Sequence, residues 1–513
     1  MQRMAGMDAA FLYLETPSMH MHVIGVMVLD PGDAPGGFTL DRLTRLLTER
    51  IHLIPSLRRR MLPAPAGIDH PLWIEDPDFD VRQHVRRAPW PQPMAWSDLE
   101  EFAGMVASRP LDRSRPLWEM WLADLEDGSG VALVTKLHHS LMDGGAGADL
   151  MASIFDLEPD GDGVAPPDAE WVPDVVPTTR HQVTGSVTSL VARQRHVPAA
   201  LAHSVSGVAS TAWTWMSLRL AGIGLPLAAP ATPFNGSLSP RRSVSLTRVD
   251  LDVVLGIRKA FGTTVNDVVL AASATALRSY LLDRNALPHR DLLAAVPVSA
   301  HRPNGGRDAS QKDLGNKKRA NKDLVNQVSA MMVPLPVRSD DPVERLMAVH
   351  ANSTSSKALQ SAFGPESLAE MTGFTLPPVM TAAARFYSGL GLARFHPPLM
   401  NLIISNVPGP PIDLYLAGAR VTGIFPMGPL MEGSGVNLTV LSEARHLNIG
   451  IMACPDLFED VDELGRGFVE AIDELAELAG LVTTTEPTEP NESTEPTEPT
   501  ESAARAVQAD SAT

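Results

Sequence analysis

Strand-like apolar runs alternate with segments of helical periodicity twice along this chain, once before residue 177 and again after residue 241. The run 131–137 has the length and apolar content of a buried strand, whereas 38–51 places apolar residues at helical spacing. Because 513 residues exceed what one hydrophobic core organises, the two halves predict two α/β domains side by side. The expected strands are 20–29, 117–122, 131–137, 292–298, 328–337, 400–404, 436–441 and 446–453. The expected helices are 38–51, 148–155, 265–282 and 460–478, and one opened by a capping-box pattern at 97–100.

The segments outside these halves differ from them in composition. We expect domains at 1–177 and 241–481, a crossover at 178–240 and a tail at 482–513. The tail repeats Pro, Thr and Glu, carries seven acids against one base and has no apolar face to bury. A segment of this kind cannot offset its ordering entropy, which predicts a disordered acidic tail.

The charge balance and the cysteine count exclude several classes of protein. A net charge of −18 makes nucleic acid an unsuitable partner. Cys454 is the only cysteine, which excludes an intrachain disulfide framework and a multi-cysteine zinc site. The apolar run that ends at Glu15 is too short for the core of a signal peptide, so we expect a cytosolic protein.

The crossover contains a stretch without formal charge, 197–218, that is long enough to raise the question of a membrane span. It also contains His203 and several hydroxyl residues, and its apolar side chains follow one helical stripe. An interfacial or crossover helix is therefore favoured over a spanning one. Trp213 and Trp215 are either core residues or anchors at an interface.

The stretch 131–147 carries the most informative chemistry. His138 and His139 lie at the end of an apolar run, and Asp143 and Gly144 follow in a turn. Because strand side chains alternate between faces, one histidine is expected to act chemically while the other packs or orients. Imidazole can take a proton near neutral pH, and Gly144 lets a thin substrate arm come close.

Other readings of these residues stay open on physical grounds alone. Histidine pairs and Asp-Gly turns also occur in purely structural roles. A metal site is weakly supported, because adjacent strand histidines diverge and no further ligand cluster lies nearby. A serine hydrolase is excluded by the lack of a Gly-x-Ser-x-Gly elbow, and 433–435 lacks the third glycine of a dinucleotide loop.

The sequence His138-His139-Ser140-Leu141-Met142-Asp143-Gly144 matches the HHxxxDG motif of the superfamily that includes chloramphenicol acetyltransferase, carnitine acyltransferases and peptide-synthetase condensation domains. More narrowly, the chain resembles the bacterial wax ester synthase/diacylglycerol acyltransferase family. The resemblance extends in family order over nearly the whole body and rests also on 7–11, 115–119, 265–271, 296–299 and 405–410. It implies an α/β fold of two chloramphenicol-acetyltransferase-like domains with an active-site tunnel between them.

The companion motifs add candidate substrate-binding residues, each with a structural alternative. Trp118 is expected more as an aromatic plug than as a substrate contact. Asn266 and Asp267 open a helix, so they either cap it or line the channel, as the resemblance implies. Ser405 and Asn406 belong to a motif that borders the tunnel in relatives.

The chain departs from the family pattern in one loop. Relatives place a Gly-Asn pair directly before the strand that here begins at Gln327, but this chain has Val325-Asn326 there. Gly315-Asn316 lies ten residues upstream, in a near-duplicate of the segment 322–326. The geometry of this basic loop is therefore not predicted.

The resemblance implies transfer of a fatty acyl group from acyl-CoA to diacylglycerol, giving triacylglycerol, or to a long-chain alcohol, giving a wax ester. His139 would be the general base, His138 would support the loop, and Asp143 would fix its geometry. Acyl-CoA would be a co-substrate, with no other cofactor and no metal. Basic residues of 302–322 are a candidate contact for the CoA phosphates.

Lipid substrates also imply a place in the cell. We expect peripheral association with the inner membrane or lipid droplets through 197–240. The alternative is a condensation-like lipid-binding protein that is inactive or depends on a carrier protein.

Overall fold

The computed structural model describes residues 1–481 apart from 33, 35, 68, 129, 142–145, 162, 168–170, 195–228, 300–327 and 364–376. Several expectations lie outside the described residues. They concern Asp143 and Gly144, the uncharged stretch with Trp213 and Trp215, the basic loop with its near-duplication, and the acidic tail.

The first of two large sheets is built around β7 (Val131–His138), whose residues are all buried. Its strand order is β12-β13-β2-β7-β6-β5, and β2 (His22–Asp30) runs antiparallel to both β7 and β13. The remaining strands are β5 (Val85–Arg87), β6 (Trp118–Asp124), β12 (Tyr415–Leu416) and β13 (Ala419–Met427).

Two strands of this first sheet, β12 and β13, come from the C-terminal half of the chain. The sequence pattern places them in the second domain, 241–481, whereas the structure pairs β13 with β2. No strand was expected at 415–427, and the sheet that a segment joins depends on hydrogen bonds to residues far away in the sequence, here those of β2. The first sheet is therefore completed by strands that come from the expected second domain, 241–481.

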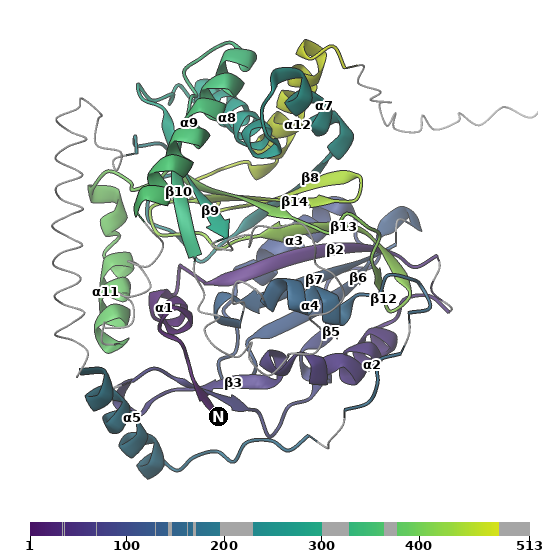
Figure 1. Cartoon of the computed structure of the whole chain (residues 1–513), viewed down its shortest axis with the longest axis vertical. Coiled ribbons are helices and arrows are strands. Elements are labelled where there is room, and N and C mark those ends of the chain that lie inside the picture. Colours follow the sequence, from purple (N-terminus) through teal and green to yellow (C-terminus); the bar gives the residue numbers. More distant parts are fainter. Residues whose placement is uncertain are drawn as a thin grey trace, which may run out of the picture.

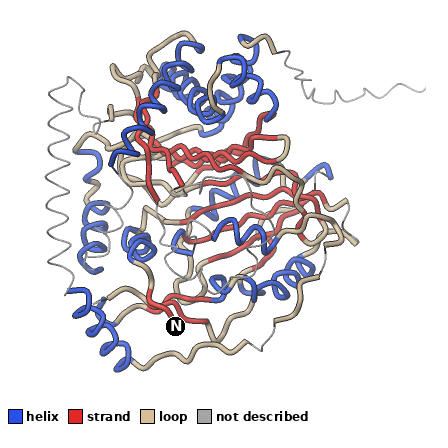
Figure 2. Tube along the Cα trace, viewed as in Figure 1, coloured by secondary structure: helices blue, strands red, loops and turns tan. Residues whose placement is uncertain are grey.

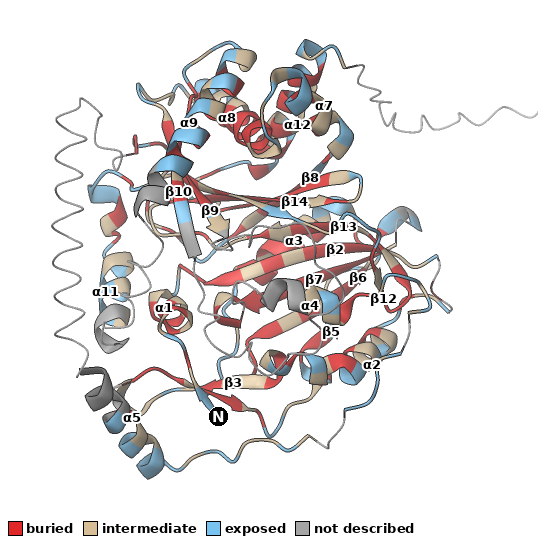
Figure 3. Ribbon diagram, viewed as in Figure 1, coloured by how far each residue is buried: buried red, intermediate tan, exposed pale blue. Residues whose placement is uncertain are grey.

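The second sheet has the order β10-β9-β11-β14-β15-β8, in which β11 runs parallel to β9 and β14. Helices cover its outer face, and their apolar sides form the largest buried cluster with the sheet (Figures 1 and 3). The strands are β8 (Ser243–Asp250), β9 (Leu292–Ser299), β10 (Val328–Leu335), β11 (Leu402–Pro408), β14 (Val436–Glu443) and β15 (His446–Ala453). The helices are α7 (Leu251–Phe261), α8 (Val265–Asp283), α9 (Pro342–Phe363) and α12 (Val461–Leu478).

Further elements surround the first sheet and its edges. A small sheet of β1 (Gln2–Arg3), β4 (Leu72–Glu75) and β3 (Arg59–Leu62) lies near the N-terminus (Figure 1). The helices are α1 (Gly6–Leu14), α2 (Leu40–Arg50), α3 (Trp96–Ala107), α4 (Ala146–Ile154), α5 (Thr179–Gln194) and α11 (Pro377–Gly389). Short 3-10 turns are η1 (Ile51–Leu53), η2 (Pro55–Arg58), η3 (Pro65–Gly67), η4 (Val81–Gln83), η5 (Glu126–Gly128), η6 (His139–Leu141) and η8 (Leu392–Phe395).

The two sheets lie as separate layers that meet where β13 passes β14 and β15 (Figure 2). Gly450 of β15 permits this approach, because a Cβ there would collide with the Pro426 carbonyl oxygen. A polar contact also crosses the junction, since the Glu100 carboxylate on α3 accepts a hydrogen bond of 2.7 Å from the Leu246 backbone N–H on β8. The expected α/β fold with two sheet-rich domains is thus confirmed.

Within the described ranges, no single helix combines the length and apolar character of a bilayer span. Among the described helices, only α7 and α8 taken together, bent by 100° relative to each other, have that length and composition.

Candidate active site

The two histidines of the motif lie on different elements. His138 is the last residue of β7 and is 1% exposed, whereas His139 begins the 3-10 turn η6 and is partly exposed. The His139 backbone N–H donates to the Met21 carbonyl at 2.8 Å, which fixes the turn against the start of β2. The expected divergence of the two side chains therefore arises where the strand gives way to a tighter turn.

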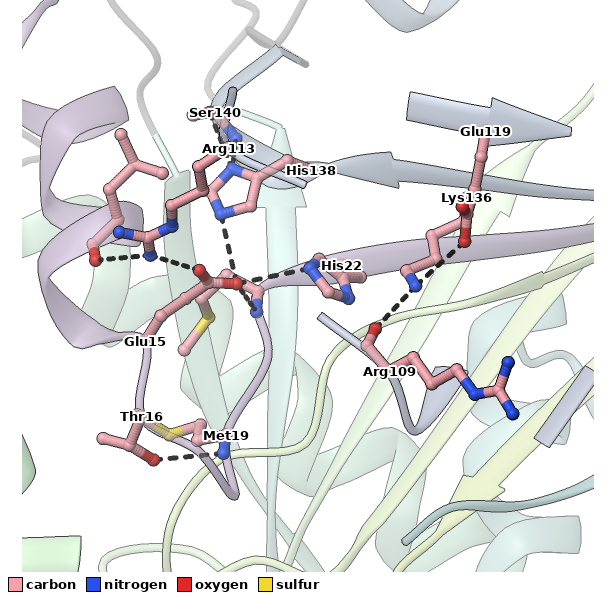
Figure 4. A network of polar contacts seen from close by, with 12 residues as sticks. Glu15, Thr16, Met19, His22, Arg109, Arg113, Glu119, Lys136, His138 and Ser140 are labelled. Carbon is pink, nitrogen blue, oxygen red and sulfur yellow. Dashed lines mark hydrogen bonds and ion pairs between the residues drawn. The ribbon is translucent and has the colours of Figure 1, made fainter. Parts of the chain in front are cut away.

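His138 is held on both sides of its ring. The Ser140 backbone N–H donates to Nδ1 at 3.0 Å, and the Ser140 hydroxyl lies 2.6 Å from the same atom. Nδ1 must therefore carry a lone pair, which places the proton of a neutral ring on Nε2. Nε2 faces the Glu15 carboxylate, 3.3 Å from Oε1 (Figure 4). The one lone pair of the neutral His138 ring is therefore already engaged by Ser140.

Glu15 is the acidic centre beneath the histidine pair. Its Oε1 also lies 3.3 Å from Nε2 of His22 and accepts the Met21 N–H at 3.0 Å, while Arg113 forms an ion pair with Oε2 (Figure 4). Burial by itself would raise the pKa of Glu15, but the His138 and His22 imidazoles hold that pKa well below its usual range. Glu15 is therefore a buried, charged acceptor that joins α1, β2 and β7.

His22 reaches this carboxylate through strand pairing. It lies directly opposite His138 in the antiparallel register of β2 and β7, and their ring centroids are 5.8 Å apart. Burial lowers the pKa of His22 to about 3, against the raising effect of Glu15. The ring is thus neutral at physiological pH and acts as a second donor to Glu15.

Lys136 supplies positive charge two residues before His138, on the same face of β7. It is fully buried, and Nζ donates to the Val106 carbonyl at 2.9 Å. Nζ also donates to the Arg109 carbonyl (2.6 Å) and to Glu119 Oε1 (3.1 Å) (Figure 4). These contacts anchor the end of α3 to the strand that carries the motif. The charge of Lys136 also contributes to the lowered pKa of the nearby strand histidine on β2.

The ring of His139, unlike that of His138, is held by stacking and not by a hydrogen bond at Nδ1. Its ring stacks on Phe11 of α1, with centroids 4.2 Å apart and an angle of 27° between the planes. Nδ1 is buried and makes no hydrogen bond with another residue. Burial lowers the pKa of His139 to about 4, with a smaller contribution from His138 and a partly compensating one from the residue's own backbone. The imidazole is therefore neutral and holds an unprotonated nitrogen at pH 7.

The loop that carries Glu15 is held by the C-terminal half of the chain. Ser18 Oγ lies 2.9 Å from Ser388 Oγ on α11, and the Ser18 carbonyl accepts a hydrogen bond of 2.6 Å from Arg242. Arg242 is buried and also donates to the Ser239 carbonyl at 2.5 Å. The candidate site is thus stabilised from both halves.

Trp118 has the environment of a core residue. It is 2% exposed, its Nε1 donates to the Leu57 carbonyl at 2.8 Å, and its ring stacks on His84 with centroids 4.4 Å apart. Both the indole N–H and the ring of Trp118 are therefore in contact with other residues of the protein interior. These contacts favour the aromatic plug over a substrate contact.

Asp267 closes a capping box at the start of α8. Its Oδ2 accepts from the Thr264 backbone N–H at 3.0 Å and from the Thr264 hydroxyl at 2.8 Å, and it lies 2.8 Å from Nδ1 of His350 on α9. Burial raises the pKa of Asp267, but these partners more than offset that effect and lower it. Asn266 beside it is partly exposed. Both residues lie in the helical layer over the second sheet.

Ser405 and Asn406 lie on β11, opposite Thr439 and Val440 of β14, and both are partly exposed. Among the described residues, neither this pair nor the pair that opens α8 makes a hydrogen bond to the histidine cluster.

The structure surrounds the predicted histidines with Glu15, His22 and Arg113, none of which was predicted as a site residue. The available signal was His22, which lies near the start of the expected strand 20–29. Using that signal requires the register between β2 and β7, which the sequence pattern does not give.

The comparisons with known proteins identify the class to which this fold and site belong, the acyltransferases. The family model "Wax ester synthase/diacylglycerol acyltransferase catalytic domain" matches residues 4–269, and "WS/DGAT C-terminal domain" matches 324–476. The chain belongs to the wax ester synthase/diacylglycerol acyltransferase family.

Relatives and solved structures agree with this assignment. A Mycobacterium tuberculosis protein provisionally named a diacylglycerol O-acyltransferase is 36% identical over 93% of this chain and 90% of its own length. A second protein from that species with the same provisional name is 33% identical over 93% and 96%. The fold resembles the wax ester synthase/diacylglycerol acyltransferase of Marinobacter aquaeolei VT8, with a TM-score of 0.64 and 24% identity over 94% of this chain and all of that one. It also resembles the first condensation domain of the calcium-dependent antibiotic synthetase, with a TM-score of 0.53 and 17% identity over 93% and 96%.

Proposed function

We propose that this acyltransferase moves a fatty acyl group from acyl-CoA to the hydroxyl of diacylglycerol, of a long-chain alcohol, or of both. The observation that carries the proposal is the state of His139. It is a neutral imidazole, partly exposed at the end of the central strand, beside a histidine whose Nδ1 accepts from Ser140 and whose Nε2 faces Glu15. A general base needs this combination of an available lone pair and access to substrate.

In the proposed reaction, the acceptor oxygen attacks the thioester carbonyl while His139 takes the hydroxyl proton. The new carbon–oxygen bond replaces the carbon–sulfur bond, and the proton passes to the departing CoA thiolate. Because Nδ1 of His139 is buried, Nε2 is the nitrogen that we assign to this transfer. Both substrates meet in one ternary complex, so the proposal includes no acyl-enzyme, no metal and no cofactor other than the co-substrate.

His138 and Glu15 have supporting roles in this proposal. His138 joins the Ser140 turn to Glu15, which directly follows α1, the helix whose Phe11 stacks on the base. Asp143 and Gly144 are proposed to shape the loop and to let the substrate approach, as their motif implies. The basic residues of 302–322 stay a candidate contact for the CoA phosphates.

The family supports the choice of lipid acceptors. The two mycobacterial relatives are named for diacylglycerol, and the Marinobacter protein is named for both activities. We propose that the protein is cytoplasmic and reaches these acceptors by peripheral association with the inner membrane or with lipid droplets. The likeness to condensation domains concerns the fold, so a carrier-protein-dependent or inactive binding protein is an outcome to be tested.

The test is an incubation of the purified full chain with radiolabelled palmitoyl-CoA and either diolein or hexadecanol, followed by chromatography of the products. We expect labelled triacylglycerol, labelled wax ester or both. Labelled lipid retained by the protein without either ester would instead support the lipid-binding alternative.

A further inference from the structure

Four large apolar side chains are exposed within a short segment of the C-terminal half. Phe386 is 64% exposed, Leu390 50%, Phe395 74% and Leu399 65%. Phenylalanine and leucine are usually among the more buried residues, and a group of them at one place on a surface marks a contact site. We name these four residues the α11 apolar edge.

The α11 apolar edge belongs to one folded unit. Phe386 lies in the last turn of α11, and the Leu390 N–H donates to its carbonyl at 3.1 Å, directly after the helix ends. The turn η8 follows after Gly391, whose φ of 60° lies in the left-handed region. The Tyr387 hydroxyl lies 2.5 Å from Nε2 of His396, which ties the residues after η8 back to the helix. The exposed side chains are therefore held on a defined scaffold.

The charge of this unit differs from that of the chain. Residues 377–400 contain Arg385, Arg394 and His396 and no acidic residue, although the whole chain has a net charge of −18. The Arg394 guanidinium lies over the Phe395 ring, 5.2 Å from its centroid, within the range of a cation–π contact. Aromatic and aliphatic side chains flanked by arginines suit the boundary between acyl chains and anionic headgroups.

A cavity of about 470 Å³ lies beside α11. It is lined by Thr381, Ala382 and Arg385 of α11 and by residues of α1, among others. Arg113 also lines it, and the guanidinium of Arg113 pairs with Glu15, whose carboxylate contacts the first histidine of the motif. The helix α11, which carries Phe386 of the apolar edge, thus also borders a cavity lined by Arg113, the partner of Glu15.

We propose that the α11 apolar edge docks on a lipid surface that contains anionic headgroups and places the cavity beside it at that surface. This inference rests on the proposed function, because a lipid acceptor must be drawn from such a surface. It assigns docking to a different segment from 197–240. A lipid partner is favoured over a protein because the exposed apolar group, the basic flank and the cavity lie together along α11 and the segment that directly follows it.

The test is flotation of the purified full chain with vesicles of phosphatidylcholine containing phosphatidylglycerol. Changing Phe386 and Phe395 to Ser should weaken vesicle binding by roughly tenfold or more, since each loses a large apolar side chain from the contact. Arg394→Gln should weaken binding to these vesicles but not to phosphatidylcholine alone. The matched control is Val172→Ser with Val175→Ser, two exposed residues elsewhere (78% and 84%), which should float as the unaltered chain does.

Two readouts separate docking from catalysis. The Phe386→Ser/Phe395→Ser variant should melt normally and keep its thiol release with detergent-dispersed hexadecanol, but lose activity toward diolein held in vesicles. Flotation equal to that of the unaltered chain would overturn the docking proposal and leave the proposed activity standing. The docking proposal would also be overturned, with the proposed activity still standing, if the unaltered chain failed to float or bound only through an added protein. Absence of thiol release from the unaltered chain in detergent would instead contradict the proposed function.

Discussion

Nε2 of His138 lies 3.3 Å from Oε1 of Glu15, while Nδ1 of the same ring accepts the Ser140 N–H at 3.0 Å. The unprotonated Nδ1 of His138 is therefore already occupied by Ser140 and its Nε2 faces Glu15, whereas the ring of the neighbouring His139 makes no hydrogen bond with another residue through its Nδ1. In the proposed mechanism, the buried carboxylate of Glu15 at the end of α1 thus favours His139 as the base by holding the ring of His138.

Replacing His138 should be less damaging than replacing His139. His138→Ala removes a contact to Glu15 and the acceptor for the Ser140 N–H, so we expect lower thermal stability and a moderate loss of kcat. Both are measured on the same preparation, with CoA thiol release as the assay. If a folded His138→Ala variant lost more activity than His139→Ala, the two roles would have to be exchanged.

Glu15→Gln keeps the shape of the side chain but removes its charge. His22 and Arg113 then face a neutral amide, so we expect a loss of about 1–3 kcal/mol in the free energy of unfolding, measured by denaturant titration. The rate should fall through displacement of the turn, and the acid limb of the pH profile should stay in place because His139 still titrates it.

The control for this carboxylate is Asp80→Asn. It removes the charge from a surface ion pair with Arg82, so the free energy of unfolding should change little. Unchanged stability of Glu15→Gln, equal to that of this control, would contradict the role assigned to the buried carboxylate.

The pH dependence of kcat/KM should report the lowered pKa of His139. The basic form of a histidine with a pKa of about 4 predominates at all higher pH values, so the rate should stay level from pH 8 to about 5 and fall below about pH 4. Samples are returned to pH 7 and assayed again, which separates titration from unfolding. A midpoint near the ordinary value of 6.5 would show that the ring is solvated during turnover.

Asp267→Asn separates the capping role from a role in the substrate channel. The change weakens the contact with His350 and the capping box, so the free energy of unfolding should fall by about 1–2 kcal/mol while activity per folded molecule is kept. The matched control is Asp250→Asn at the start of α7, which should change stability little because asparagine can also accept the Asp252 N–H. Normal melting of Asp267→Asn together with lost activity would place Asp267 at the channel instead.

Much of the fold could be predicted from local patterns. The expected strand 131–137 is β7 (Val131–His138), and the expected helix 265–282 is α8 (Val265–Asp283), because apolar runs and helical spacing are local properties. The sheet that a strand joins is not local. The assignment of β13 to the first sheet depends on hydrogen bonds to β2, far away in the sequence.

The same distinction holds for the candidate site. The divergence of His138 and His139 could be predicted from strand geometry, but the partnership of Glu15 with the two strand histidines required the register between β2 and β7. Exposure could not be predicted either. Phe386 and Phe395 look like ordinary core residues in the sequence, and only the packing of α11 and η8 leaves them at the surface.

The most direct test of the account is acceptor-dependent release of CoA thiol from palmitoyl-CoA, compared between the unaltered chain and His139→Ala. We expect release that requires diolein or hexadecanol, and a fall of roughly two to four decades in the variant, the usual contribution of a general base. Melting temperature measured in parallel shows that the variant is folded. Equal rates for a folded His139→Ala variant would contradict the assignment of His139 as the base.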